Sequence, residues 1–175
     1  MRIISRIALL LLPLSLLALP TAARAVGPGG DLYFGYSRLG ANAFHANTPG
    51  LNGWEGEGQV KFLPFVGIDA DVAHYGLGAA STVAHTTTVM AGPRVTVGAA
   101  GVHVFAHGLF GAEHSTNSGG VISATGVTVD AGAGIDFTLL HFFAWRVNAD
   151  YIDAPNQSPS TADRYRFGTG LVFRF

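Results

Sequence analysis

Cysteine is absent from the sequence, which excludes a disulfide framework and any thiolate that would ligate a metal or act as a nucleophile. After residue 25 the chain also lacks an apolar run long enough for a membrane-spanning helix. Signals for helix starts and stops are hard to find, whereas Gly and Ala recur throughout. The 150 residues that follow residue 25 amount to one domain.

The first 25 residues have the three parts of a secretory signal peptide. Residues 1–6 carry two arginines, residues 7–19 are apolar, and Ala23-Arg24-Ala25 resembles a cleavage site. A transmembrane helix is the alternative, but Pro13 and Pro20 interrupt a run that is short for a bilayer span. We therefore expect cleavage after Ala25, a flexible leader over 26–30 and one domain over 31–175.

Positive charge is in short supply after that cleavage, because Arg2, Arg6 and Arg24 leave with the signal peptide. Ten basic residues become seven while all eleven acidic residues remain, so the net charge is −4 with histidine neutral. A surface that binds nucleic acid needs a basic stripe, so we expect no nucleic-acid partner.

The sequence is rich in period-2 alternation of apolar and polar residues, which is the pattern of strands with two unlike faces. The clearest case is 53–62, where Glu55, Glu57, Gln59 and Lys61 all face one way. Eight such segments are predicted: 31–38, 53–62, 66–73, 83–97, 102–114, 121–139, 143–151 and 165–175.

The connections between these segments alternate in length. Turns at 63–65, 98–101 and 140–142 are short, whereas 39–52, 76–82, 115–120 and 153–162 are longer and rich in Gly, Asn, Ser, Thr and Pro. Outer-membrane barrels have short periplasmic turns, longer extracellular loops and an even number of strands. The predicted fold class is all-β: an eight-stranded antiparallel up-and-down transmembrane β-barrel with both termini on the periplasmic side, preceded by a cleaved signal peptide.

The last segment is the most informative about location. Tyr165, Phe167, Leu171, Phe173 and Phe175 occupy alternate positions, and the residues between them are small, apolar or cationic. A strand with an apolar outer face that ends on the last residue is typical of a bacterial outer-membrane barrel.

If the aromatic faces meet lipid, the polar faces converge inside the barrel. The predicted interior network consists of Glu55, Glu57, Lys61, Asp69, Asp71, Arg94, Asp136, Arg146, Asp150, Arg166 and Arg174. An eight-stranded barrel is only just wide enough for its side chains, so charges there must be paired. An ion network that fills the lumen is the favoured interpretation, and a narrow gated pore is the alternative.

Two features concern individual positions in this arrangement. Pro93 interrupts a predicted strand, and since a closed barrel has no free edge, we expect a bulge near it on the periplasmic side. Aromatic residues near the strand ends suit the two membrane-interface girdles: Tyr33, Tyr36, Trp54, Tyr75, Trp145, Tyr151 and Tyr165.

Seven histidines invite a catalytic or metal hypothesis, which the spacing does not favour. His103 and His107 share a strand face but lie about 13 Å apart, too far for one ion. Glu113, His114 and Ser115 imitate a hydrolase site, yet adjacent strand residues point to opposite faces. We predict no catalytic, cofactor-binding or metal residues, with a lipid-modifying rim enzyme as the weakest alternative.

With these segments identified, the chain resembles the small outer-membrane β-barrel family of the OmpA/OmpX type over about 31–175. More narrowly, three segments resemble the outer membrane protein beta-barrel domain group: 51–57 (LNGWEGE), 92–95 (GPRV) and 144–147 (AWRV). The resemblance implies that the alternating residues Tyr165, Phe167, Leu171, Phe173 and Phe175 form the signal read by the barrel assembly machinery. It also implies a structural, membrane-stabilising or adhesion-like role in the bacterial outer membrane.

The expected partners are therefore outer-membrane lipid, the assembly machinery during biogenesis and an external ligand reached through the four longer loops. A soluble lipocalin-like barrel is the alternative at the level of fold. It would place the apolar faces inside and the charges outside.

The terminal residue provides the first test. Deleting Phe175 should reduce assembly and leave the protein in periplasmic aggregates, because the signal read by the assembly machinery would be incomplete. Quantitative immunoblotting of outer-membrane and periplasmic fractions measures this, and normal outer-membrane levels of the shortened chain would contradict the role.

Overall fold

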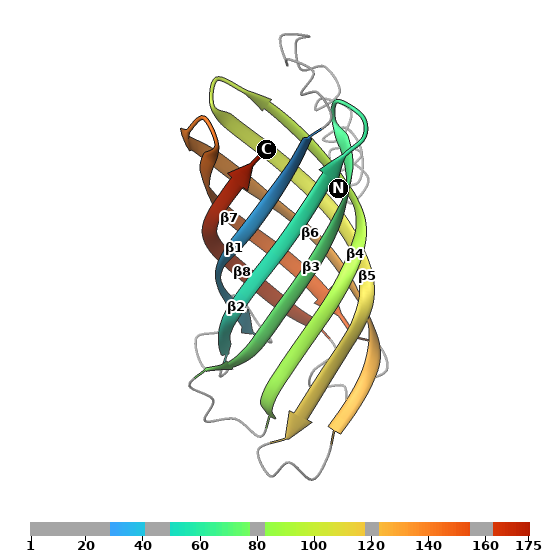
Figure 1. The fold of residues 1–175 in the computed structure, drawn as a ribbon. Coiled ribbons are helices and arrows are strands. Elements are labelled where there is room, and N and C mark those ends of the chain that lie inside the picture. The colour runs from blue at the N-terminus through green and yellow to red at the C-terminus, as the bar shows by residue number, and fades with distance from the viewer. Residues whose placement is uncertain (1–28, 41–49, 78–82, 118–122, 155–162) are drawn as a thin grey trace, which may run out of the picture.

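Eight antiparallel strands close into one barrel in the computed structural model of the chain (Figure 1). The structure describes residues 29–40, 50–77, 83–117, 123–154 and 163–175, so the predicted signal peptide lies outside the described residues. Each strand pairs with the next in sequence, and β8 pairs with β1. The strands are β1 (Gly29–Gly40), β2 (Leu51–Lys61), β3 (Val66–Leu77), β4 (Val83–Ala99), β5 (Val102–Asn117), β6 (Ser123–Leu140), β7 (Phe143–Asp153) and β8 (Asp163–Arg174).

The first and last strands form the closing seam. Their register pairs Phe34 with Leu171, and Asp31 with Arg174. Beyond the end of β8, Phe175 exchanges two backbone hydrogen bonds with Gly30, at 2.9 and 3.0 Å between nitrogen and oxygen. The terminal residue is therefore part of the seam through its backbone, whatever its side chain contacts.

Short connections lie at one end of the barrel, which we call the turn end (Figure 1). There, Ala100 and Gly101 join β4 to β5 with φ angles of 52° and 85°. Two successive positive φ angles match the right-handed twist of the flanking strands. The opposite end, where the longer connections leave the barrel, is called the loop end.

Several strands extend further toward the loop end than the alternation predicted. β1 ends at Gly40, β3 at Leu77 and β5 at Asn117, whereas β4 begins at Val83 as predicted and β6 begins at Ser123, two residues later than predicted. For β1, β3 and β5 the predicted boundaries were wrong because ladder hydrogen bonds continue beyond the last apolar residue of a face. The remaining loop residues lie outside the described part of the chain.

Pro93 does not produce the predicted bulge. It stays in register opposite Ile68 of β3, and the pairing of β4 with β5 skips Gly92 and Pro93 but resumes with the same register at Arg94. Proline has no N–H to donate, so the ladder is interrupted locally rather than shifted. Register shifts occur instead near strand ends, between Asn52 and Gly53, between Val83 and His85, and between Thr138 and Leu140.

The two faces of the sheet have opposite polarity. Large apolar side chains cover the outside, with Phe34 at 65% and Phe110 at 64% exposure, whereas Glu55, Asp69 and Arg94 are fully buried. Because successive side chains point to opposite faces, one alternation builds both surfaces. A lipocalin-like barrel has the reverse arrangement, so that alternative is wrong.

Within the described ranges, no helix is both long and apolar enough to cross a membrane.

The closing seam can be tested by cross-linking, because the chain has no cysteine of its own. The double substitution Phe34→Cys and Leu171→Cys places thiols at directly opposed positions of β1 and β8, within disulfide reach. Oxidation should yield a species with altered gel mobility after boiling, reversed by reductant. The control pairs Phe34→Cys with Val147→Cys of β7, and equal cross-linking of both pairs would contradict the closed order.

Candidate functional site

The structure brings the eleven predicted interior residues together inside the barrel. Ten of them are buried. The eleventh, Arg174, has 17% of its side chain exposed near the turn end. They project from β2, β3, β4, β6, β7 and β8, so the network spans the whole lumen.

The first group of charges centres on Glu57, which accepts hydrogen bonds from both Arg94 and Arg146. Arg94 also donates to Asp69 at 3.1 Å. Arg146 holds Asp136 by two parallel bonds of 2.7 and 3.0 Å. Bidentate geometry of this kind is the strongest form of arginine–carboxylate pairing.

An aromatic ring lies beside the two arginines. The guanidinium of Arg94 lies 3.6 Å from the centre of the Phe105 ring, and that of Arg146 lies 4.5 Å from it. The negative face of an aromatic ring attracts cations when water is excluded. Gly134 makes room for this ring, because a Cβ at that position would overlap Phe105.

The second group of charges centres on Arg166. Its guanidinium donates to Asp150 at 2.7 Å, Asp71 at 2.8 Å and Asp130 at 2.9 Å. Glu55 lies 3.7 Å away. One cation from the last strand thereby contacts acids of β2, β3, β6 and β7.

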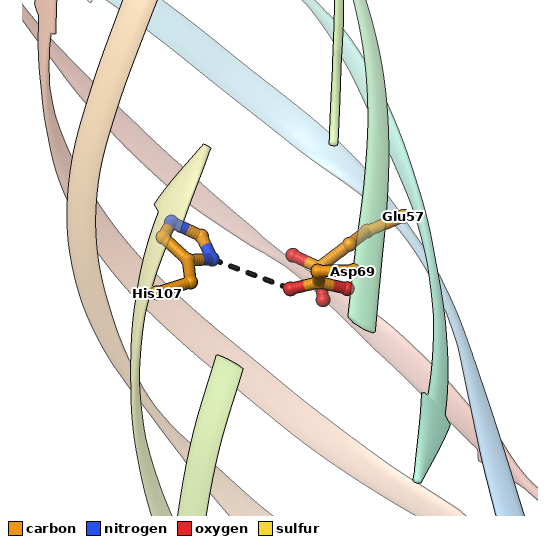
Figure 2. Close-up of side chains that lie close together, drawn as sticks. All are labelled: Glu57, Asp69 and His107. Carbon is orange, nitrogen blue, oxygen red and sulfur yellow. Dashed lines mark hydrogen bonds and ion pairs between the residues drawn. The ribbon is translucent and has the colours of Figure 1, made fainter. Parts of the chain in front are cut away.

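His107 links the two groups of charges. Its Nδ1 lies 3.3 Å from Oδ2 of Asp69, and its Nε2 lies 3.1 Å from Oδ1 of Asp150. Figure 2 shows the contact with Asp69, which lies beside Glu57. Both ring nitrogens donate only when the imidazole is protonated. Charge balance favours that state, because the described interior holds more acids than lysines and arginines. The acids are Asp31, Glu55, Glu57, Asp69, Asp71, Glu113, Asp130, Asp136 and Asp150, and the bases are Lys61, Arg94, Arg146, Arg164, Arg166 and Arg174.

Three sets of these side chains bring ligand atoms within 4.8 Å of one another: Glu57, Asp69 and His107; His107, Asp130 and Asp150; and Glu55, Glu57 and Asp71. Each set includes carboxylates that already accept hydrogen bonds from arginine. The arrangement is therefore built as an ion-pair network, in which guanidinium groups hold the positions that a cation would take.

The two ends of the interior differ. At the turn end, Lys61 contacts Asp31 at 2.9 Å, and Arg174 contacts Asp136 at 3.0 Å. Toward the loop end, a cluster of buried side chains packs inside the lumen, where the buried pair Glu113 and Arg164 also lies. We call this cluster the apolar plug: Leu39, Leu51, Ala73, Tyr75 and Ile152.

Five buried acidic or basic residues of the described interior were missed by the sequence prediction: Asp31, His107, Glu113, Asp130 and Arg164. Each obeys the alternation of its strand, so the signal was present. The inward face of β5 was ambiguous because it also carries the apolar residues Phe105 and Leu109. Arg164 precedes the predicted start of the last strand and pairs with Glu113.

The outward face carries the residues of the predicted assembly signal. Phe167, Leu171, Phe173 and Phe175 are exposed. Tyr165 lies on the same face, with its ring 5.6 Å from that of Tyr151. Their position leaves them accessible, and their role in assembly stays a prediction.

The girdle prediction was wrong for two tyrosines. Tyr33 and Tyr75 point inward and are buried, whereas Tyr36, Trp54 and Trp145 are exposed on the outside. The inward tyrosines have polar or cationic partners, since Tyr75 bonds Ser37 at 3.2 Å and Tyr33 lies under Arg146. Proximity to a strand end does not reveal which face a residue occupies.

The hydrolase-like triplet does not form a relay. Ser115 donates to Glu113 at 2.9 Å on the inner face, whereas His114 is exposed outside and bonds Thr125 at 2.9 Å. A nucleophile and its base must lie within hydrogen-bonding distance.

Comparison with known proteins shows what the fold is similar to. No protein-family model and no curated protein matches the chain. Among solved structures, Neisserial surface protein A (NspA) superposes with a TM-score of 0.67 at 8% identity, over 86% of this chain and 98% of that one. Ail, the attachment invasion locus protein of Yersinia pestis, superposes with a TM-score of 0.57 at 19% identity, over 86% of this chain and 100% of that one. The N-terminal barrel domain of Pseudomonas aeruginosa OprF superposes with a TM-score of 0.64 at 13% identity, over 85% of this chain and 98% of that one.

The chain has the fold of the small outer-membrane β-barrels. The predicted fold class, an all-β eight-stranded antiparallel up-and-down barrel, is confirmed.

The interior network gives a stability prediction. Glu57→Gln should lower the free energy of unfolding by about 3–5 kcal/mol, because two buried guanidinium groups lose their shared charged acceptor. Urea titration of the protein in lipid vesicles, followed by tryptophan fluorescence, measures this. The exposed Arg38→Gln serves as control and should stay within about 0.5 kcal/mol of the parent. An unchanged urea midpoint for Glu57→Gln would show that the network does not stabilise the barrel.

Proposed function

We propose that this protein is a non-enzymatic barrel of the bacterial outer membrane, with a structural or surface-interaction role. One observation carries the proposal: an apolar outer surface surrounds an interior of paired charges. In water, an outer surface with this many exposed large apolar side chains would drive association. In a bilayer, the same surface meets hydrocarbon, and the closed ladder leaves no edge unpaired.

A filled lumen supports a structural role over a pore. An ion that crossed the barrel would have to separate buried pairs such as Arg94 with Glu57, and breaking one costs about 3–5 kcal/mol. It would then meet the apolar plug, where Leu39, Tyr75 and Ile152 offer a hydrated ion little to bind.

The separation of His114 from Ser115 supports a non-enzymatic role. A rim hydrolase would need both groups on one face of β5. Here, the serine belongs to the inner network through Glu113, and the histidine faces outward.

Partners would meet the loop end and the seam. We infer that the segments predicted as loops, 39–52, 76–82, 115–120 and 153–162, present an external ligand site, as the attachment role in the name of Ail suggests for a barrel of similar fold. The predicted signal would be read by the assembly machinery before the seam closes: Tyr165, Phe167, Leu171 and Phe173 of β8, and Phe175 directly after it.

Membrane fractionation tests the location and planar-bilayer recording tests the closed lumen. The protein should sediment with the outer membrane, migrate differently before and after boiling, and give no steady openings, whereas a reconstituted general porin serves as the conducting control. Recovery from the soluble periplasm would refute the location. Steady openings that change with Arg94→Gln would refute the filled lumen and favour the narrow pore.

A further inference from the structure

We propose that a band of polar residues on the outer surface at the loop end binds the phosphate groups of a phosphorylated glycolipid. This polar collar consists of Arg38, His74, His85, Thr87, His114 and Thr125. The proposal rests on the proposed membrane location and adds to it a lipid of defined chemistry.

The collar begins where the apolar surface ends. On β3 the outward positions Ile68, Ala70 and Val72 lead to His74. On β4, Val89 is followed toward the loop end by Thr87 and then His85. Outward positions two residues apart lie about 7 Å apart along a strand, so the collar directly adjoins the apolar belt.

Its members are neighbours across four strands. His74 pairs with Thr87, Thr87 pairs with His114, and His114 pairs with Thr125. The rings of His74 and His85 stack with centroids 5.7 Å apart and planes at 17°. Side chains from β3 to β6 therefore form one continuous strip rather than isolated polar residues.

Hydrogen bonds hold two of the imidazoles in place. Nδ1 of His74 lies 2.9 Å from the Thr87 hydroxyl, and Nδ1 of His114 lies 2.9 Å from the Thr125 hydroxyl. When the hydroxyl donates to Nδ1, the hydrogen of the neutral ring sits on Nε2. Among the described residues, neither Nε2 has a partner, so both can donate to a phosphate oxygen outside the barrel.

In the described ranges, the charged side chains that face outward are Arg38 and Asp153, and both lie toward this end. Arg38 is the only lysine or arginine that faces outward in the described part of the chain. It lies two residues beyond Tyr36 on β1, and Tyr36 pairs with Trp54 of β2. Trp54 in turn pairs with His74. A guanidinium near a row of imidazole donors complements phosphate in charge and in hydrogen bonding.

The turn end of the same surface is built differently. Its outward residues include Phe62, Leu63, Phe65, Leu139, Leu140 and Phe142, with His141 as the histidine among them. In a symmetric bilayer, both ends of the barrel would meet headgroups of the same chemistry. A continuous strip of donors at the loop end, beside a mainly apolar turn end, fits a membrane whose outer leaflet carries phosphorylated sugars.

The experiment uses the folded full-length protein in neutral detergent, with bisphosphorylated lipid A as the probe. Binding is followed by the heating temperature at which the folded gel band disappears, and by competition with a fluorescent lipid A. The dephosphorylated glycolipid, phosphatidylglycerol and inorganic phosphate are the comparison ligands.

The triple substitution His74→Gln, His85→Gln and His114→Gln should weaken binding of bisphosphorylated lipid A at least about tenfold, because hydrogen bonds to a charged group are lost. The matched control His141→Gln at the turn end should bind as the parent does. Both variants change residues on the outward face and should keep the folded gel band.

Each outcome decides the proposal. Phosphate-dependent binding that the triple variant loses and His141→Gln keeps would support it. Equal binding of the dephosphorylated glycolipid, equal binding by the triple variant, or equal preference for phosphatidylglycerol or inorganic phosphate would overturn it. A parent protein that fails to insert into vesicles would refute the membrane location as well, whereas insertion without phosphate dependence would refute the collar alone.

Discussion

The pairing of buried guanidinium groups with carboxylates is the interaction on which this barrel depends. Eight strands enclose a space that side chains must fill, so the charges inside have little access to water. Arg94, Arg146 and Arg166 are fully buried, and each contacts at least two acids. If one of these arginines were absent, the carboxylates that it contacts would be buried without that positively charged partner.

The same narrowness governs the small residues of the inner face. Gly35, Gly134 and Gly168 lie where a Cβ would overlap Tyr33, Phe105 and Asn148 respectively. Each glycine leaves space for a larger side chain from a neighbouring position on the wall. The high glycine content, 24 residues in the chain, is thus partly explained by the size of the arginines and aromatic rings that the lumen holds.

Alternation allowed most of this to be predicted from the sequence. It identified all eight strands and both faces of β2, because Glu55, Glu57, Gln59 and Lys61 leave no doubt about polarity. It left undecided which face of β5 points inward, because Phe105 lies on that face to meet two arginines that only the folded barrel brings near it. It failed for Pro93, because the sequence does not reveal that a ladder can skip a residue pair and keep its register. Pairings such as Arg146 with Glu57 join positions 89 residues apart, which no local pattern encodes.

The position of the cations along the chain affects how the barrel can be completed. Three of the six interior lysines and arginines, namely Arg164, Arg166 and Arg174, lie on the last strand. A sheet of the first seven strands would therefore have a strongly acidic concave face, since Asp71, Asp130 and Asp150 wait for Arg166. Repulsion among these acids and their hydration would disfavour closure of such a sheet. In the closed barrel, the cations of β8 neutralise the acids of the other strands.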